Sequence, residues 1–440
     1  MLKFFGMIAS VSLLSLASST PLLAQTGGAL DNGISGRAIS LGGATVASVT
    51  SPLEAMQGNP AGLAGRSLEA NITSLFATGN FTNSVSNTGS IVTSAGTIPY
   101  GGFSMPLFSK RLTLGVSVAP DTLMTANWKY MDPPGGLGGT SYGLQQNKSA
   151  MITLRSAAGL SFVVNKRLVI GGTFGAIYDK NTLIAPYIFQ SQPTLAGAKT
   201  LLDLHTNGVG YNGSFGALLA PSSKLRIGLS YKMSASVHTH GDASGDAGAQ
   251  FATLGVNAPA TFHYDAEVDT KFPQAFSGGI WWRVAPRLRL NLQGDWIDWS
   301  HSFNQLPVKL SNGTNTTING LVGSNAMQDA IPLQWRDQGV FGVGVESPVG
   351  EHLAFRGGYS YATNPVPSAT LTPMTAAILQ NTIGTGLGYS RGRYSLDLAY
   401  QVQLPATQSV GQSSLKSGEY NDSQVEVAVH SVTLTSQIHF

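Results

Sequence analysis

The chain has 440 residues, with 25 Lys and Arg against 22 Asp and Glu, 53 glycines and no cysteine. Charged residues make up only 11% of the sequence, whereas an ordinary soluble domain has roughly 25%. This low charge argues against a soluble enzyme, and a net charge of +3 is too small to indicate a nucleic-acid-binding protein. Without cysteine the chain forms no disulfide, thiolate metal site or cysteine nucleophile.

Residues 1–24 have the pattern of a secretory signal peptide. Lys3 supplies the positive start, residues 7–17 form an apolar segment, and Ala24 ends a cleavage motif before Gln25. The apolar segment is too short for a membrane anchor, which is the competing interpretation. The rest of the sequence contains no apolar stretch of the roughly 18 residues that a spanning helix requires. If the mature chain crosses a membrane, it must therefore do so as a closed β-barrel.

Apolar and polar residues alternate with period two in many segments, including 149–162, 224–233 and 393–404. A soluble β-sandwich would alternate in the same way, so the period alone does not say which face is exposed. We predict strands at residues 67–79, 98–108, 110–119, 148–164, 167–178, 202–220, 224–237, 262–284, 286–300, 335–347, 351–361, 381–391, 393–403 and 424–440.

The connections between these strands favour the barrel, because tight turns alternate with long loops along the whole chain. The long loops fall at residues 80–97, 120–147, 179–201, 238–261, 301–334, 362–380 and 404–423. Short turns at one rim and long loops at the other are typical of outer-membrane barrels. The sequence therefore predicts an all-β fold, a transmembrane antiparallel β-barrel of about 14 strands over residues 67–440, in the bacterial outer membrane.

The C-terminal strand supports this location. Residues 431–440 alternate in polarity and end in Phe440, which resembles the signal that outer-membrane barrels present to their assembly machinery. We therefore expect outer-membrane lipid and the barrel-assembly machinery as partners. Five tryptophans near the predicted strand ends favour an aromatic girdle at the membrane surface over ordinary core packing. They are Trp281, Trp282, Trp296, Trp299 and Trp335.

Residues 25–66 precede the first strand and are too few to fold alone. A short helix is predicted at 51–56, with Ser51 as N-cap, Pro52 at the first helical position and Glu54 at the third. A turn is predicted at Asn59, Pro60, Ala61 and Gly62. Because a barrel of this size has a bore wide enough to need filling, we expect residues 25–66 to form a hatch inside it.

These residues carry a family resemblance. Residues 36–38, Gly43 and the Asn-Pro-Ala-Gly-Leu run at 59–63 resemble the hatch of the FadL-type outer-membrane long-chain fatty-acid and hydrocarbon transporters (the OmpP1/FadL/TodX-like family). Residues 273–300, 356–359 and 364–367 resemble later parts of that family. Where family members often have Ser-Pro-Val-Pro-Asp, this chain has Asn364 at the start and Ser368 at the end.

The resemblance implies passive uptake of hydrophobic compounds by a monomer. Ligand would be captured between the third and fourth long loops, enter an apolar pocket in the barrel, and leave sideways at a kink in the third strand after the hatch moves. The apolar residues of those loops are the ligand-binding candidates, although packing of one loop on another explains them equally well. They are Leu183, Ile184, Tyr187, Ile188, Phe189, Phe251 and Leu254.

Two arginines and one glycine complete the candidate site. Arg155 and Arg356 lie on the polar face of their strands and should point into the lumen. Each could bind a ligand carboxylate, or could pair with an acidic residue and hold the hatch, for instance through Asp31 or Glu54. The resemblance places a lateral gate in the third strand, where Gly115 and the terminal Pro120 are both able to weaken the ladder; Gly115 is the predicted gate.

Two other functions compete with this interpretation. A general diffusion porin predicts a charged lumen without a hatch, which the low charge and residues 25–66 oppose. An outer-membrane hydrolase needs clustered catalytic groups, and only His238, His240 and His263 are placed to cluster. With no third ligand identified for a metal beside the two neighbouring histidines, a solvated loop is favoured. We expect no enzyme activity, no cofactor and no metal site; the choice of cargo between fatty acid and aromatic or aliphatic hydrocarbon stays open.

Overall fold

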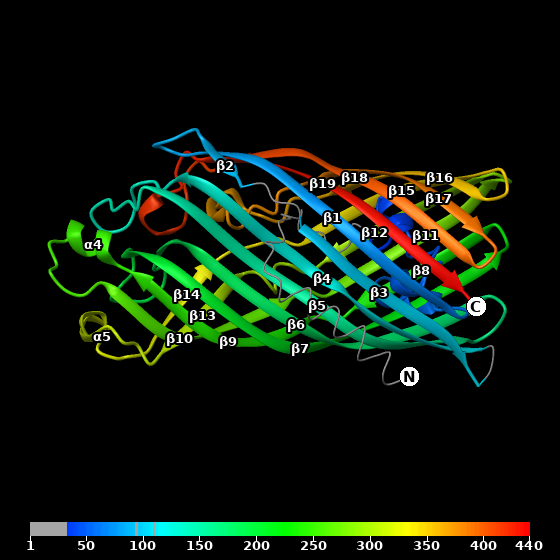
Figure 1. Cartoon of the computed structure of the whole chain (residues 1–440), viewed down its shortest axis with the longest axis horizontal. Coiled ribbons are helices and arrows are strands. Elements are labelled where there is room, and N and C mark those ends of the chain that lie inside the picture. The colour runs from blue at the N-terminus through cyan, green and yellow to red at the C-terminus, as the bar shows by residue number, and fades with distance from the viewer. Residues whose placement is uncertain (1–32, 93–95, 109–110) are drawn as a thin grey trace.

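The computed structural model describes residues 33–92, 96–108 and 111–440. The predicted signal peptide and the first residues of the hatch lie outside the described residues. The described chain forms an elongated, closed antiparallel barrel of 14 strands (Figure 1). The predicted fold class is confirmed.

Twelve of the wall strands are single segments in the described chain. They are β1 (Ser67–Thr82), β3 (Gly96–Leu107), β4 (Leu112–Met131), β5 (Leu144–Val163), β6 (Leu168–Ile188), β7 (Lys199–Ser222), β12 (Leu288–Ile297), β15 (Gln338–Val349), β16 (Leu353–Ala362), β17 (Asn381–Arg391), β18 (Tyr394–Ser409) and β19 (Gln424–His439). The other two wall strands have two segments each, β8 (Leu225–Lys232) with β9 (Ala235–Asp246), and β10 (Thr261–Phe272) with β11 (Ala275–Ala285). β1 pairs with β19 and closes the wall.

Several strands continue beyond the ends that the sequence predicts. β6 runs to Ile188 and β7 starts at Lys199, so residues predicted as the third loop are mostly wall. Residues 301–334, predicted as a loop, contain the hairpin β13 (Gln305–Ser311) and β14 (Met327–Pro332). Residues 80–97, also predicted as a loop, contain β2 (Gly89–Ile91), which pairs with β1 and β4. These loop predictions were wrong because the wall extends above the membrane, where strands no longer show the apolar outer face that identifies them.

The barrel is apolar outside and polar inside over its membrane-spanning part. Phe174, Phe215 and Phe341 are outward and 60% or more exposed. On β19, Val432 and Leu434 face outward, whereas Thr433 and Thr435 are buried in the lumen. Buried polar residues under an exposed apolar surface are the reverse of a soluble sandwich and are expected when lipid covers the outer face.

Two of the five tryptophans predicted to form an aromatic girdle lie on the outer face, as that prediction requires. Trp282 and Trp296 are exposed on the outer face. Trp281, Trp299 and Trp335 are buried, and for these three the prediction was wrong because they pack inside the barrel. Trp299 and Trp335 contact each other edge to face, with ring centroids 5.0 Å apart.

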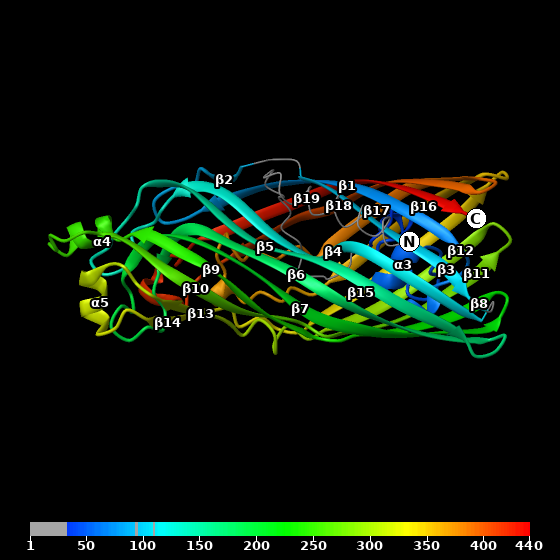
Figure 2. The ribbon, with the colours of Figure 1, turned by 60° about the horizontal axis from the view of Figure 1, so that its bottom comes forward.

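Residues 33–66, the described part of the segment predicted as a hatch and called the hatch below, lie in the bore near the end with the short turns, where α3 is visible through the wall in Figure 2. The hatch consists of α2 (Gly36–Ser40), α3 (Pro52–Gln57) and the 3-10 turn η1 (Pro60–Gly62). Ser51 caps α3 by accepting a 3.3 Å hydrogen bond from the Glu54 amide, as its sequence predicts. Within the described residues, no helix is long and apolar enough to span a membrane.

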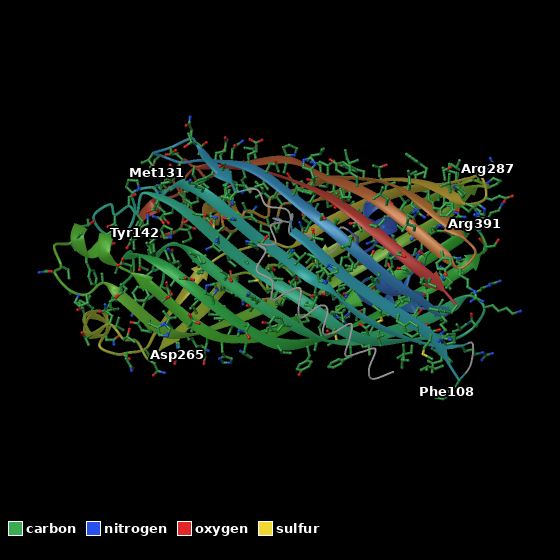
Figure 3. All side chains as sticks on the ribbon, viewed as in Figure 1. Phe108, Met131, Tyr142, Asp265, Arg287 and Arg391 are labelled. Carbon is green, nitrogen blue, oxygen red and sulfur yellow. The ribbon has the colours of Figure 1, made fainter. Side chains whose placement is uncertain are left out.

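The opposite end carries the long loops, with α4 (Gly248–Thr253) and α5 (Thr316–Val322) at its tip (Figure 1). Figure 3 places Tyr142 and Asp265 toward this end and Arg287 and Arg391 at the turn end. The two remaining short elements are the 3-10 turns η2 (Ser368–Thr370) and η3 (Lys416–Gly418).

Residues 363–380, which connect β16 to β17, fold into the bore as an inner loop. Leu371 and Ile378 are buried in a cluster with Phe81, Trp299 and Trp335, which come from other parts of the chain. The inner loop therefore fills part of the lumen on the extracellular side of the hatch.

Candidate functional site

An apolar cavity of about 240 Å³ lies between the hatch and the extracellular loops. Its walls come from β4 to β7, β10, the β13–β14 hairpin, α4, α5, the inner loop and the loop between β18 and β19. The larger apolar side chains that line it include Met124, Met151, Leu202, Leu204, Phe262, Val268, Phe303, Leu310, Ile318, Met327, Leu333 and Trp335. An apolar cavity with few polar groups is the usual form of a site for a hydrophobic small molecule.

Five of the seven loop residues predicted to bind ligand line this cavity. They are Leu183, Tyr187, Ile188, Phe189 and Phe251. The other two, Ile184 and Leu254, are not among the lining residues. The side chain of Ile184 lies on the outer face of β6, on the same side as Phe174. Leu254 follows α4 and is half exposed.

Lys199 is fully buried at the edge of the cavity, at the start of β7. Its Nζ donates to Asp132 Oδ1 at 2.8 Å and to the Pro133 carbonyl at 2.8 Å, and lies 2.9 Å from Glu419 Oε2. The ammonium therefore joins three extracellular segments. Burial raises the pKa of Glu419 to about 7 in spite of the ammonium, and burial also raises the pKa of Asp132.

Asp329, on β14, is the second polar centre of the cavity. Its carboxylate accepts hydrogen bonds from the Tyr187 hydroxyl at 2.6 Å and from the Ser191 hydroxyl at 2.7 Å. Backbone amides of Gln190, Ser191 and Gln192 donate to it as well, at 2.9, 2.5 and 3.1 Å. Asp329 thus fastens the β13–β14 hairpin to the end of β6 and the short loop that follows.

Arg155 lies against the hatch, away from the cavity lining. Its guanidinium donates to the Met56 carbonyl at 3.0 Å, to Asn212 Oδ1 at 2.7 Å and to Thr173 Oγ1 at 2.7 Å. Of the two roles that the sequence allows for this residue, the contacts favour holding the hatch.

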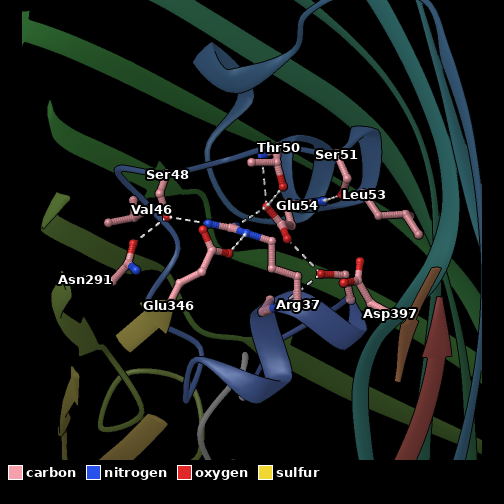
Figure 4. A network of polar contacts seen from close by, with 12 residues as sticks. Arg37, Val46, Ser48, Thr50, Ser51, Leu53, Glu54, Asn291, Glu346 and Asp397 are labelled. Atoms are coloured by element: carbon pink, nitrogen blue, oxygen red, sulfur yellow. Dashed lines mark hydrogen bonds and ion pairs between the residues drawn. The ribbon is translucent and has the colours of Figure 1, made fainter. Parts of the chain in front are cut away.

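Arg356 belongs to a network of charges at the hatch, of which Arg37, Glu54, Glu346 and Asp397 are labelled in Figure 4. Its Nε donates to Glu346 at 2.7 Å, and its Nη1 donates to Asp397. Glu346 also accepts from Arg37 of the hatch at 3.3 Å, and Arg37 reaches Glu54 at 3.1 Å. Arg356 therefore holds the hatch through Glu346 and Arg37, whereas Asp31 lies outside the described residues.

The Asn-Pro-Ala-Gly turn of the hatch rests on wall glycines. Asn59 Oδ1 accepts from the Ala61 amide at 3.2 Å, and Asn59 Nδ2 donates to the Ala217 carbonyl at 3.1 Å. A Cβ on Gly171 would lie 2.5 Å from the Pro60 carbonyl carbon, and a Cβ on Gly216 would overlap the Asn59 side chain. Only glycine permits this close approach.

The ladder between β3 and β4 is interrupted, and we call this stretch the wall interruption. Residues 112–118 of β4 pair with β3. Among the described residues, the next two residues of β4, 119 and 120, pair only with β5 on their other side. Residues 96–99 of β3 likewise pair only with β1. Pro120 lacks an amide donor, and the register with β5 shifts at the next residue. The Thr122 amide instead donates to Thr153 Oγ1 at 2.6 Å.

Gly115, the predicted gate, lies outside the wall interruption. It pairs with Ser104 on β3 and with Gly159 on β5. A Cβ at this position would lie 2.5 Å from Leu63 of the hatch. The irregular part of β4 lies a few residues further along, at Pro120, the other residue that the sequence indicated, and at Asp121.

The histidines form no catalytic or metal cluster in the part of the chain that the structure describes. His238 and His240 are exposed and lie 2.5 and 3.5 Å from Asp269 and Glu267. Among the described residues no group of three or more His, Asp or Glu side chains could hold a metal ion.

The lipid-facing barrel, the anchored hatch and the apolar cavity above it together define an outer-membrane transport barrel. Residues 19–440 match the family described as outer membrane protein transport protein (OMPP1/FadL/TodX), and the chain belongs to this family. Its members are transport proteins, so the chain is an outer-membrane transporter of the hydrophobic-compound class and not an enzyme.

Solved structures share this fold at low sequence identity. The toluene transporter TbuX of Ralstonia pickettii is 19% identical, with a TM-score of 0.71 over 93% of this chain and 99% of that chain. The toluene transporter TodX of Pseudomonas putida is 16% identical, with a TM-score of 0.72 over 93% and 98%. A FadL homologue of Pseudomonas aeruginosa is 15% identical, with a TM-score of 0.71 over 95% and 99%. No curated protein sequence matches the chain.

Proposed function

We propose that the protein takes up hydrophobic compounds passively, through capture at the extracellular loops, residence in the apolar cavity, and lateral exit at the wall interruption. The main observation in support of this proposal is that the cavity lies next to the wall interruption. Met124 and Thr125 of β4 line the cavity directly beyond the irregular residues Pro120 and Asp121.

Capture is supported by apolar side chains exposed on the loop tips. Leu137, Leu254, Val256 and Leu321 are between 38% and 57% exposed. Leu321 also lines the cavity, so the exposed surface continues into it. The Gln250 amide of α4 donates to the Leu137 carbonyl at 2.7 Å, which holds the second loop beside the fourth. Exposed apolar residues gathered in this way suit a surface that collects a hydrophobic molecule from water.

Lateral exit is supported by the lost ladder contacts. A wall segment with fewer inter-strand hydrogen bonds opens at lower cost than a continuous ladder. A hydrophobic molecule that leaves there enters lipid directly, and it avoids the hatch and the charged network beneath it. Gly115 remains relevant to this route only through its contact with Leu63 of the hatch.

A general diffusion porin is the weaker alternative. The hatch and the inner loop occupy the bore, and the cavity lining is mostly apolar. A water-filled path for sugars would require both obstructions to move.

The test locks the wall interruption in a chain that has no cysteine of its own. Tyr100→Cys with Ala119→Cys places a disulfide one register step beyond the last paired residues, Gly101 and Val118. Met105→Cys with Leu114→Cys is the matched control, because these residues face each other within the continuous ladder. Uptake of radiolabelled toluene and oleate by cells would be measured with and without reductant.

The oxidised Tyr100–Ala119 pair should lose most uptake of the transported compound and regain it on reduction, while the control pair transports normally in both states. Equal uptake by the two oxidised variants would rule out exit at the wall interruption. Flux of sugars with no uptake of apolar compounds would instead establish the porin.

A further inference from the structure

We propose that the transported molecule is uncharged, and that Asp132, Glu419 and Asp329 exclude carboxylates such as ionised fatty acids from the cavity. The inference rests on the proposed function and adds the substrate class to it. The strong carboxylate-binding groups at the cavity are all occupied by the protein's own acidic side chains. This occupation would be the source of the specificity.

The cavity has very little charge. Of the residues that line it in the described chain, only Lys199, Asp329 and Glu419 are of the Asp, Glu, Lys or Arg type. A ligand carboxylate in an apolar cavity needs a cation or several hydrogen-bond donors, because an unpaired charge in such a cavity is strongly unfavourable. Lys199 is the one lining cation among the described residues, so its contacts decide whether a carboxylate can bind.

The Lys199 ammonium is already occupied by the protein's own groups. It donates hydrogen bonds to Asp132 Oδ1 and to the Pro133 carbonyl, each at 2.8 Å, and it forms an ion pair with Glu419 Oε2 at 2.9 Å. Two of these partners are acidic side chains, so once both are ionised the buried group of three has no positive charge left for a ligand. A fatty-acid carboxylate would have to displace one of them and would then meet the other.

The second set of donors is occupied in the same way. The amides of residues 190–192 converge on one carboxylate, and they would suit the head group of a fatty acid. Asp329 already fills this position with both of its oxygens. A neutral molecule needs neither Lys199 nor the amides of residues 190–192, because it binds through contacts with the apolar walls alone.

The experiment compares two probes of equal chain length, 1-decanol and decanoate, with the full-length protein in detergent. Binding is measured by isothermal titration at pH 8, where decanoate is ionised, against protein-free micelles. Wild-type protein should bind decanol at least about tenfold more tightly than decanoate. Equal or tighter binding of decanoate by the wild type would overturn the inference, whatever the variants do.

A double variant tests the residues directly. Asp132→Asn with Glu419→Gln keeps the size of both side chains and frees the charge of Lys199, so decanoate affinity should rise at least about tenfold while decanol affinity stays unchanged. Adding Lys199→Met should abolish the gain. A double variant that keeps decanol binding but gains nothing for decanoate would contradict the role of Lys199.

Failure of the proposed function gives a different result. If the wild-type protein binds neither probe and cells take up neither, the transport proposal fails and the inference fails with it. If decanoate and decanol are both taken up and bound equally, the transport proposal stands and only the exclusion of carboxylates is refuted.

Discussion

Arg155 of the wall donates a 3.0 Å hydrogen bond to the backbone carbonyl of Met56, the fifth residue of the hatch helix α3. The same guanidinium binds Asn212 and Thr173 of the neighbouring strands. A single buried side chain thus connects the hatch to three wall strands.

Replacing Arg155 by Met should loosen the hatch. The change leaves the Met56 carbonyl and the Asn212 amide oxygen without their charged donor, at a cost of about 2 kcal/mol. Hydrogen exchange of residues 52–57 should therefore become faster by more than tenfold. Arg287→Met, at an exposed turn, is the control, and equal exchange in the two variants would contradict an anchoring role.

Gly216→Ala should displace the Asn-Pro-Ala-Gly turn. Its added Cβ would overlap Asn59 Oδ1, so the turn must move away from the wall. We expect faster proteolysis of the hatch in assembled barrels. Gly357→Ala provides the control, since a Cβ there meets no atom within 4 Å. If both variants are cleaved at the same rate, close packing of the hatch on Gly216 is unimportant.

Asp329→Ala should release the β13–β14 hairpin from the loop after β6. Three backbone amides and two hydroxyls lose their shared acceptor. Exchange of residues 189–198 should accelerate at least about tenfold, which corresponds to about 1.4 kcal/mol. Asp203→Ala, an exposed position on β7, should leave this loop unchanged. Protection that survives in Asp329→Ala would show that other contacts hold the hairpin.

The contact around Lys199 should weaken as the pH rises. Burial raises the pKa of Glu419 from 4.5 to about 7, so the closed loops bind a proton that the opened loops release. This stabilisation is complete below pH 4.5 and is lost as the pH passes 7. Corrected exchange of residues 410–423 should be slower at pH 5.5 than at pH 8. Glu419→Gln should remove most of the difference, and an unchanged difference would assign it to another group.

The sequence predicts the wall strands well because two of their features are imposed by the bilayer. These features are the alternation of apolar and polar residues along each strand, and the placement of short turns at one rim and long loops at the other. The sequence also predicts the start of α3, since Ser51, Pro52 and Glu54 form a local pattern that does not depend on the barrel. The inward direction of Arg155 and Arg356 follows from strand parity alone.

The remaining site depends on contacts between distant parts of the chain. Lys199 meets Asp132 and Glu419 across long separations, and nothing near these residues in the sequence marks them. Asp329 was missed for the same reason. The ends of β6 and β7 were missed because strands above the bilayer no longer need an apolar outer face. The prediction for Trp299 and Trp335 was based on their distance from a strand end. That distance is the same for a tryptophan at the membrane surface and for one that packs inside the barrel.

The inner loop at residues 363–380 has a consequence for the cell. It begins and ends on β16 and β17, the strands whose Gly358 and Gly384 lie against the end of α2 and the two residues that follow it, so it overlies the hatch on the extracellular side. Displacing the hatch would therefore leave a second obstruction in place. A bacterium could keep many copies of such a protein in its envelope without admitting antibiotics, detergents or other water-borne toxins through them.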